Sequence, residues 1–108
     1  MIVILARFVI RDGKESEALE AVRTMSGQVR AGEPGCLVYL CHRSLAEPSE
    51  IVWYEVYEDD AAVATHGGSE HMKAFGRRLP EIVDVTQIKV ERLERVEGFV
   101  RESFPKAT

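Results

Sequence analysis

The pattern of apolar and polar residues divides the chain into alternating strands and helices. Residues 1–10 are almost wholly apolar and rich in β-branched side chains, which is typical of a strand covered on both faces. Further on, apolar residues recur at three- and four-residue steps as far as Val29, and this spacing predicts an amphipathic helix that ends at Gly32. Asp12 is the predicted N-cap of that helix, because Glu15 three residues later completes a capping box.

Two further strands are predicted in the middle of the chain. Residues 36–43 and 51–58 have strong β propensity, and the short connection between them contains Pro48, so the pair is predicted to form an antiparallel hairpin. The second of these strands has one face made of Ile51, Trp53, Glu55 and Tyr57, and another made of Val52, Tyr54, Val56 and Glu58. Periodicity alone does not decide which of the two faces meets the helices.

A second helical region follows the hairpin. Asp59 or Asp60 is predicted to cap a short helix over residues 61–66, which a glycine pair then interrupts. Ser69 is predicted to cap a new helix, and Pro80 is predicted to end it.

The last part of the chain completes the predicted fold. Apolar and polar residues alternate over residues 82–96 with one shift of phase, which indicates a bulged strand. We expect one domain over residues 1–97, followed by residues 98–108 as either a docking arm or a tail. The order β-α-β-β-α-β predicts an α+β, ferredoxin-like fold, a four-stranded antiparallel sheet with both helices on one face. The other face would expose too much apolar surface for a monomer, so we expect a homodimer with sheets packed face to face.

Composition and charge narrow the class of protein. The chain has 108 residues and a formal net charge of −4, which argues against a surface for nucleic acid or anionic membranes. The apolar segment at residues 1–6 is too short for a secretory signal or a membrane span, so we expect a cytoplasmic protein.

Cys36 and Cys41 lie an odd number of residues apart in one predicted strand, and we expect them on opposite faces without a disulfide.

Three blocks of sequence resemble the antibiotic biosynthesis monooxygenase domain. They are EPGCLVY at residues 33–39, VWYEVYEDDAAVATH at 52–66 and SEHMKAF at 69–75, and the similarity extends over residues 1–92. The resemblance implies a dimeric α+β barrel with a pocket between sheet and helices in each subunit. It also implies the chemistry of those members that oxidise phenols or hydroquinones to quinones without metal or flavin.

Haem and metal chemistry find little support in the sequence. A related branch degrades haem with an Asn, a Trp and a His, but this chain has no asparagine, His66 stands about where the Trp would be, and Phe75 or Gly76 falls near the His. On a continuous helix His66 and His71 would point about 140° apart. With His42 on a distant strand and no carboxylate at ligand spacing, we expect no metal.

Acid-base chemistry is the alternative that the histidines suggest. Triplet dioxygen reacts slowly with neutral organic molecules, so a protein without a cofactor must remove a proton and hold the anion, and histidine suits this with a pKa of roughly 6.5. His66 is the candidate base, because the resemblance places a histidine in the same AxxxH block, here residues 62–66. Alternatively, His66 caps its helix or bonds to Glu55.

Glu55 needs a partner in so apolar a strand, and Arg7 is predicted to be that partner.

The remaining candidates would shape the pocket. The predicted substrate-binding residues are Tyr54, His71, Met72 and Phe75. For Met72 and Phe75 the alternative is ordinary core packing, and for His71 it is solvent exposure.

The sequence therefore predicts a cofactor-independent monooxygenase that acts with dioxygen on a small aromatic phenol or hydroquinone, as a homodimer and without nucleic acid or membrane partners. Two alternatives stay open. One is a non-catalytic dimer that binds a small molecule in the same cavity, and the other is a proton-transfer enzyme such as an isomerase or decarboxylase.

Overall fold

The computed structural model describes residues 1–104, and residues 105–108 lie outside it. Along the chain the elements are β1 (Ile2–Val9), α1 (Glu15–Gly32), β2 (Cys36–Arg43), β3 (Glu50–Tyr57), α2 (Asp60–Gly68), α3 (Glu70–Ile82), the 3-10 turn η1 (Val85–Gln87) and β4 (Lys89–Leu93). The predicted tail over residues 98–108 continues beyond the described residues, and its described part forms neither helix nor strand.

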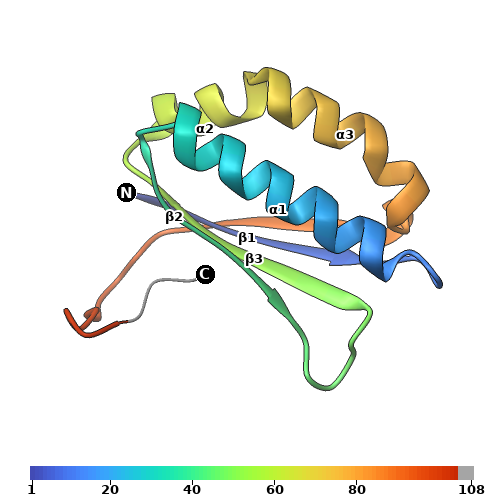
Figure 1. Ribbon diagram of the computed structural model, residues 1–108. Helices are drawn as coiled ribbons and strands as arrows, with labels where there is room; N and C mark the ends of the chain where they lie inside the picture. Colours follow the sequence, from blue (N-terminus) through green and yellow to red (C-terminus); the bar gives the residue numbers. More distant parts are fainter. Residues whose placement is uncertain (105–108) are drawn as a thin grey trace.

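The sheet has four strands in the order β2-β3-β1-β4, and every neighbouring pair is antiparallel. All three helices lie on one side of it (Figure 1). This confirms the ferredoxin-like α+β prediction, with the second predicted helical region divided into α2 and α3. Strand β1 lies in the middle of the sheet, with Ile4 opposite Glu55 and Ala6 opposite Trp53.

The core lies between the sheet and the helices. Every second residue of β3 points toward the helices, and of these Ile51, Trp53 and Tyr57 are each at most 2% exposed. From α1, Met25 and Val29 pack into the same core. Burying one such large side chain stabilises the fold by roughly 1.5–3 kcal/mol. The side of β3 that meets the helices is therefore the Trp53 side, a choice that periodicity had left open.

The opposite side of the sheet has no helix over it in the described chain, and we call it the open face (Figure 1). Its half-buried apolar residues are Leu5, Val38, Leu40, Val52 and Tyr54. After β4 the chain passes on this side of the sheet, where Arg95 donates a hydrogen bond to the Tyr54 hydroxyl at 3.1 Å.

Side-chain caps begin the two later helices as the sequence predicted. Asp59 accepts a hydrogen bond from the Ala62 backbone N–H at 2.9 Å, and Ser69 accepts one from that of Met72 at 3.2 Å. The prediction for α1 was wrong, because Lys14 occupies its N-cap position and makes no side-chain cap there.

The C-terminal end of α3 also differs from the prediction. Pro80 lies inside the helix, which continues to Ile82. Arg11 binds two carbonyls at this end, since its side chain donates to the Pro80 carbonyl at 3.0 Å and its backbone N–H donates to the Ile82 carbonyl at 2.9 Å. Carbonyls that the helix end leaves free thus find partners on another segment.

The last strand is shorter than predicted. Asp84 starts the turn η1 by accepting from the Thr86 backbone N–H at 3.0 Å and from the Gln87 amide at 2.8 Å. Bonds from Thr86 and Gln87 lower the pKa of Asp84 to about 2. The alternation of apolar residues therefore runs through a turn, and only Lys89–Leu93 pairs with β1 as β4.

A bulge near the start of β2 changes the placement of the cysteines. Cys36 pairs with Tyr57 and Val38 with Val56, so one residue, Leu37, has no partner. Because of this extra residue both Cys36 and Cys41 pack against the core on the helix side, which corrects the prediction of opposite faces. Both are free thiols.

Candidate active site

A small cavity lies between the helix side of the sheet and the helices α2 and α3. Its volume is about 120 Å³, somewhat smaller than a cavity of about 150 Å³ that accepts one benzene ring. The apolar part of its wall is formed by Ile4, Ala6, Phe8, Met72, Phe75 and Val90. The lining residues with polar side-chain atoms are Tyr39, Trp53, Glu55 and His66.

His66 lies in the last turn of α2 and is 9% exposed. Its Nδ1 is 3.0 Å from both carboxylate oxygens of Glu33, and its Nε2 is 4.0 Å from Oε1 of Glu55. The ring packs against those of Tyr39 and Tyr57, with centroids 5.8 and 5.4 Å apart. Nδ1 thus bonds to Glu33, which does not line the cavity, while Nε2 lies near Glu55, which does.

Glu33 is held in place by the end of α1. Its backbone N–H donates to the Val29 carbonyl at 2.9 Å, and Glu33 as a whole is only 4% exposed. The carboxylate also bonds to Nε2 of His71 at 2.5 Å. A carboxylate only accepts hydrogen bonds, so the Nδ1 atom of His66 carries a proton toward Glu33, and in the neutral form of the ring Nε2 carries the lone pair.

Glu55 is the second buried carboxyl group beside His66, and it is 6% exposed. The Tyr57 hydroxyl donates to it at 2.5 Å. Burial raises the pKa of Glu55, and the bond from Tyr57 and the nearby His66 oppose this rise. The predicted partner was wrong: Arg7 bonds to Glu50 at 2.9 Å, because Arg7 points to the open face and Glu55 to the helices.

Trp53 carries a polar group that nothing in residues 1–104 satisfies. Its indole Nε1–H is fully buried and has no hydrogen-bond partner there. The ring packs between Phe8 and Phe75, with centroid distances of 4.9 and 6.1 Å. Leaving a buried donor unpaired costs about 1–3 kcal/mol, so a ligand oxygen that accepts from this N–H would recover that cost.

The structure brings together only some of the residues that the sequence singled out. His66, Met72 and Phe75 all line the cavity. His71 does not line it but bonds to Glu33 behind His66. Tyr54 lies on the open face, so the structure does not bring it into this cavity.

Sequence reasoning missed Glu33, Tyr39 and Trp53 as site residues. The alternation along residues 51–58 already placed Trp53 and Glu55 on one face, so choosing that face would have found Trp53. Glu33 gave no local signal, because its contact with His66 joins residues 33 positions apart.

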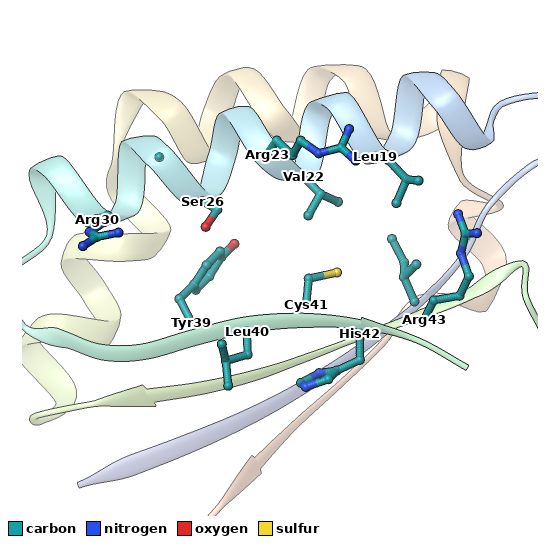
Figure 2. Close-up of a pocket in the computed structure, with 12 residues that line it drawn as sticks. Leu19, Val22, Arg23, Ser26, Arg30, Tyr39, Leu40, Cys41, His42 and Arg43 are labelled. Carbon is teal, nitrogen blue, oxygen red and sulfur yellow. The ribbon is translucent and has the colours of Figure 1, made fainter. Parts of the chain in front are cut away.

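A larger groove runs between α1 and the edge strand β2, with a volume of about 630 Å³ (Figure 2). Tyr39 and Cys41 point into it from the strand, whereas Leu40 and His42 point away from α1. Burial raises the pKa of Cys41 to about 12, so its thiol is a poor nucleophile near neutral pH. The groove holds no pair of acid and base groups, and the chemistry therefore points to the smaller cavity.

The helices of the described chain, residues 1–104, include none that is long and apolar enough to cross a membrane.

Comparison with known proteins agrees with the fold. Residues 1–78 match the family described as antibiotic biosynthesis monooxygenase. A structure from Caulobacter crescentus CB15, described as a candidate antibiotic biosynthesis monooxygenase, is 30% identical, with a TM-score of 0.83 over 89% of this chain and 90% of that one.

Two further solved structures are similar over most of their length. A protein of Shewanella oneidensis is 27% identical, with a TM-score of 0.78 over 85% of this chain and 87% of the other. A protein of Mycobacterium tuberculosis is 25% identical, with a TM-score of 0.81 over 90% of this chain and 96% of the other. No curated protein matches the sequence.

Proposed function

The chain belongs to the antibiotic biosynthesis monooxygenase family, and from that premise we propose that it oxidises a small phenol or hydroquinone to a quinone in the cavity beside His66. The observation that carries the proposal is the arrangement of His66, with Glu33 at 3.0 Å from Nδ1 and Nε2 at 4.0 Å from Glu55, which lines the cavity. A carboxylate behind an imidazole selects the tautomer and stabilises the imidazolium that forms when the ring takes a proton.

The first step is removal of the phenolic proton by Nε2 of His66. The resulting anion gives one electron to dioxygen, and the two radicals combine on the ring. For a hydroquinone, one molecule and one dioxygen give one hydroxyquinone and one water. No protein group is oxidised in this sequence, so the protein needs only to bind, to deprotonate and to exclude water.

Trp53 is the group that would hold the anion. Its unpaired indole N–H would donate to the phenolate oxygen, and a hydrogen bond to a charged group contributes roughly 1.5–3 kcal/mol. The aromatic rings of Phe8 and Phe75 would pack against the substrate ring. The small volume of the cavity, about 120 Å³, favours a single substituted ring over a polycyclic compound.

The proposal includes dioxygen as co-substrate, a homodimer as the working unit and the cytoplasm as the compartment. The apolar residues of the open face support the homodimer. The two free thiols, Cys36 and Cys41, are consistent with a reducing compartment.

Oxygen consumption tests the proposal. Protein treated with a chelator and desalted is mixed with a series of substituted hydroquinones, and uptake is followed with an oxygen electrode. We expect His66→Ala to lower kcat by about 10²–10⁴-fold, the range for loss of a general base. The hydroxyquinone product is identified by mass spectrometry after reaction under ¹⁸O₂.

His42→Ala is the matched control, because His42 is exposed and points away from the helices and the cavity (Figure 2); since His42 lies on the open face, the oligomeric mass of this variant is checked against that of the wild type. Its kcat should equal that of the wild type. Uptake that is unchanged in His66→Ala would exclude His66 as the base. Binding of the hydroquinones without any uptake would favour a binding protein instead.

A further inference from the structure

Two histidines and a carboxylate meet at a single point behind the cavity. Glu33 follows the end of α1, His66 lies in α2 and His71 lies in α3. Each of the three residues offers one ligand atom, and these atoms lie within 4.8 Å of one another. Three separate elements therefore converge on a space of the size that one metal ion occupies.

The break between α2 and α3 explains why both rings face the same carboxylate. Ser69 has an extended backbone, with φ −69° and ψ 152°, so α3 starts in a new direction. The divergence of about 140° expected on one continuous helix therefore does not apply. The carboxylate that the sequence did not reveal comes from Glu33, which is 38 positions from His71. The structure thus removes two arguments against a metal, namely the divergence of His66 and His71 on one helix and the lack of a carboxylate near them.

The donor set matches a known preference of metal ions. Two imidazoles and one carboxylate are the protein ligands of many zinc sites that keep a fourth position open, and cobalt(II) fits the same sites. The side chains are shielded from water, with exposures of 3% for Glu33, 11% for His66 and 16% for His71. A surface hollow of about 280 Å³ lies beside Glu33.

We propose that Glu33, His66 and His71 bind one divalent transition-metal ion of the zinc class. The ligand atoms are a carboxylate oxygen of Glu33, Nδ1 of His66 and Nε2 of His71, with a fourth position for water. In the metal-free protein the two ring N–H groups bond to the carboxylate instead. The ion takes the place of these hydrogen bonds and joins α1, α2 and α3.

This site goes beyond the proposed oxidation and affects it in a defined way. A metal on Nδ1 of His66 requires the neutral ring to carry its proton on Nε2, the nitrogen that faces Glu55 at 4.0 Å and the cavity. That nitrogen then cannot accept a proton from a substrate. Metal binding and the base role of His66 are therefore mutually exclusive, and the ion acts as an inhibitor.

Binding is tested without any measurement of activity. Chelator-treated, desalted protein is titrated with zinc chloride in a calorimeter and with cobalt chloride in a visible spectrophotometer. We expect one ion per chain and an intense cobalt d–d band. Glu33→Gln and His71→Ala should each weaken zinc binding at least about tenfold, while His42→Ala binds as the wild type does.

A second measurement on the wild type covers the case in which a variant fails to fold. Long-range ¹H–¹⁵N spectra of the imidazoles should show zinc-dependent shifts at Nδ1 of His66 and Nε2 of His71, with His42 unchanged. Absence of stoichiometric binding, equal affinity in the variants and wild type, or shifts at His42 alone would overturn the proposal. In those cases the cluster is a hydrogen-bonded clamp between helices, and the test of His66 as a base is unaffected.

Discussion

At the scale of single residues, the fully buried side-chain nitrogen and oxygen atoms of the described chain all have hydrogen-bond partners, with one exception. Glu33 bonds to His66 and His71, and Glu55 bonds to Tyr57, but the indole N–H of Trp53 has no partner. Buried donors in folded proteins are almost always satisfied, so an unpaired one on a residue that lines the cavity is a candidate partner for a ligand acceptor.

Replacing Trp53 with Phe tests this reading. The substitution keeps an aromatic ring between Phe8 and Phe75 but removes the donor. Loss of a hydrogen bond to an anion should lower kcat/KM for the hydroquinone by about 10- to 100-fold, as steady-state oxygen uptake would measure. A value equal to that of the wild type, in protein with an unchanged circular dichroism spectrum, would show that the N–H does not meet the substrate.

At the scale of elements, the turn between α1 and β2 places Glu33 next to α2. Gly35 lies in this turn, and its carbonyl accepts from the Glu58 backbone N–H at 2.9 Å. A Cβ atom at Gly35 would come within 2.8 Å of the Ala62 Cβ atom on α2. The turn can approach the helix this closely only because the residue is glycine.

Gly35→Ala should therefore destabilise the protein by about 1–3 kcal/mol, the usual cost of inserting a methyl group into a packed contact. Gly76→Ala is the matched control: it adds the same atom inside α3, where nothing lies within 4 Å. This control should stabilise the protein by about 0.5–1 kcal/mol, because alanine loses less backbone entropy than glycine in a helix. Urea unfolding followed by circular dichroism measures both. Equal midpoints for the two variants would contradict the close contact.

At the scale of the whole molecule, the two sides of the sheet differ in how they are covered. Three helices bury one side, whereas Leu5, Val38, Leu40, Val52 and Tyr54 remain half-buried on the open face. Apolar residues gathered on one uncovered face of a sheet mark a contact with another protein. A second copy in two-fold symmetry covers such a face with one self-complementary interface, so the dimer remains our prediction.

Light scattering coupled to gel filtration measures the association. The wild type should have about twice the chain mass of 12.1 kDa. Leu40→Asp introduces a charge on the open face and should shift the mass to that of one chain, since an unpaired charge in an interface costs several kcal/mol. Leu45→Asp serves as the control, because Leu45 is fully exposed in the loop between β2 and β3 and should leave the dimer intact. A single-chain mass for the wild type would refute the dimer.

Much of the fold could be predicted from local pattern. The three strands at residues 1–58, the helix α1 and the caps Asp59 and Ser69 follow from periodicity and short-range hydrogen bonding. The errors lie where a distant segment intervenes. Arg11 provides partners for the end of α3, and Asp84 forms a turn within the range predicted as strand.

The candidate site was predictable only in part. His66, Met72 and Phe75 were identified as pocket residues, and all three line the cavity. Tyr54 was placed with them because alternation shows that two faces exist without showing which one is buried. Glu33 could not be found in this way, since its role depends on contacts across 33 and 38 positions of sequence.

The sequence by itself determined the order of the elements and the ferredoxin-like architecture, because apolar spacing, caps and turn residues act over a few positions. Only the tertiary structure decided which face of β3 meets the helices, and which carboxylates flank His66. Those features depend on strand register and on the bulge in β2, where one residue more or less exchanges the two faces of a strand. They also depend on the approach of α1 to α2 and α3, which residue spacing does not encode.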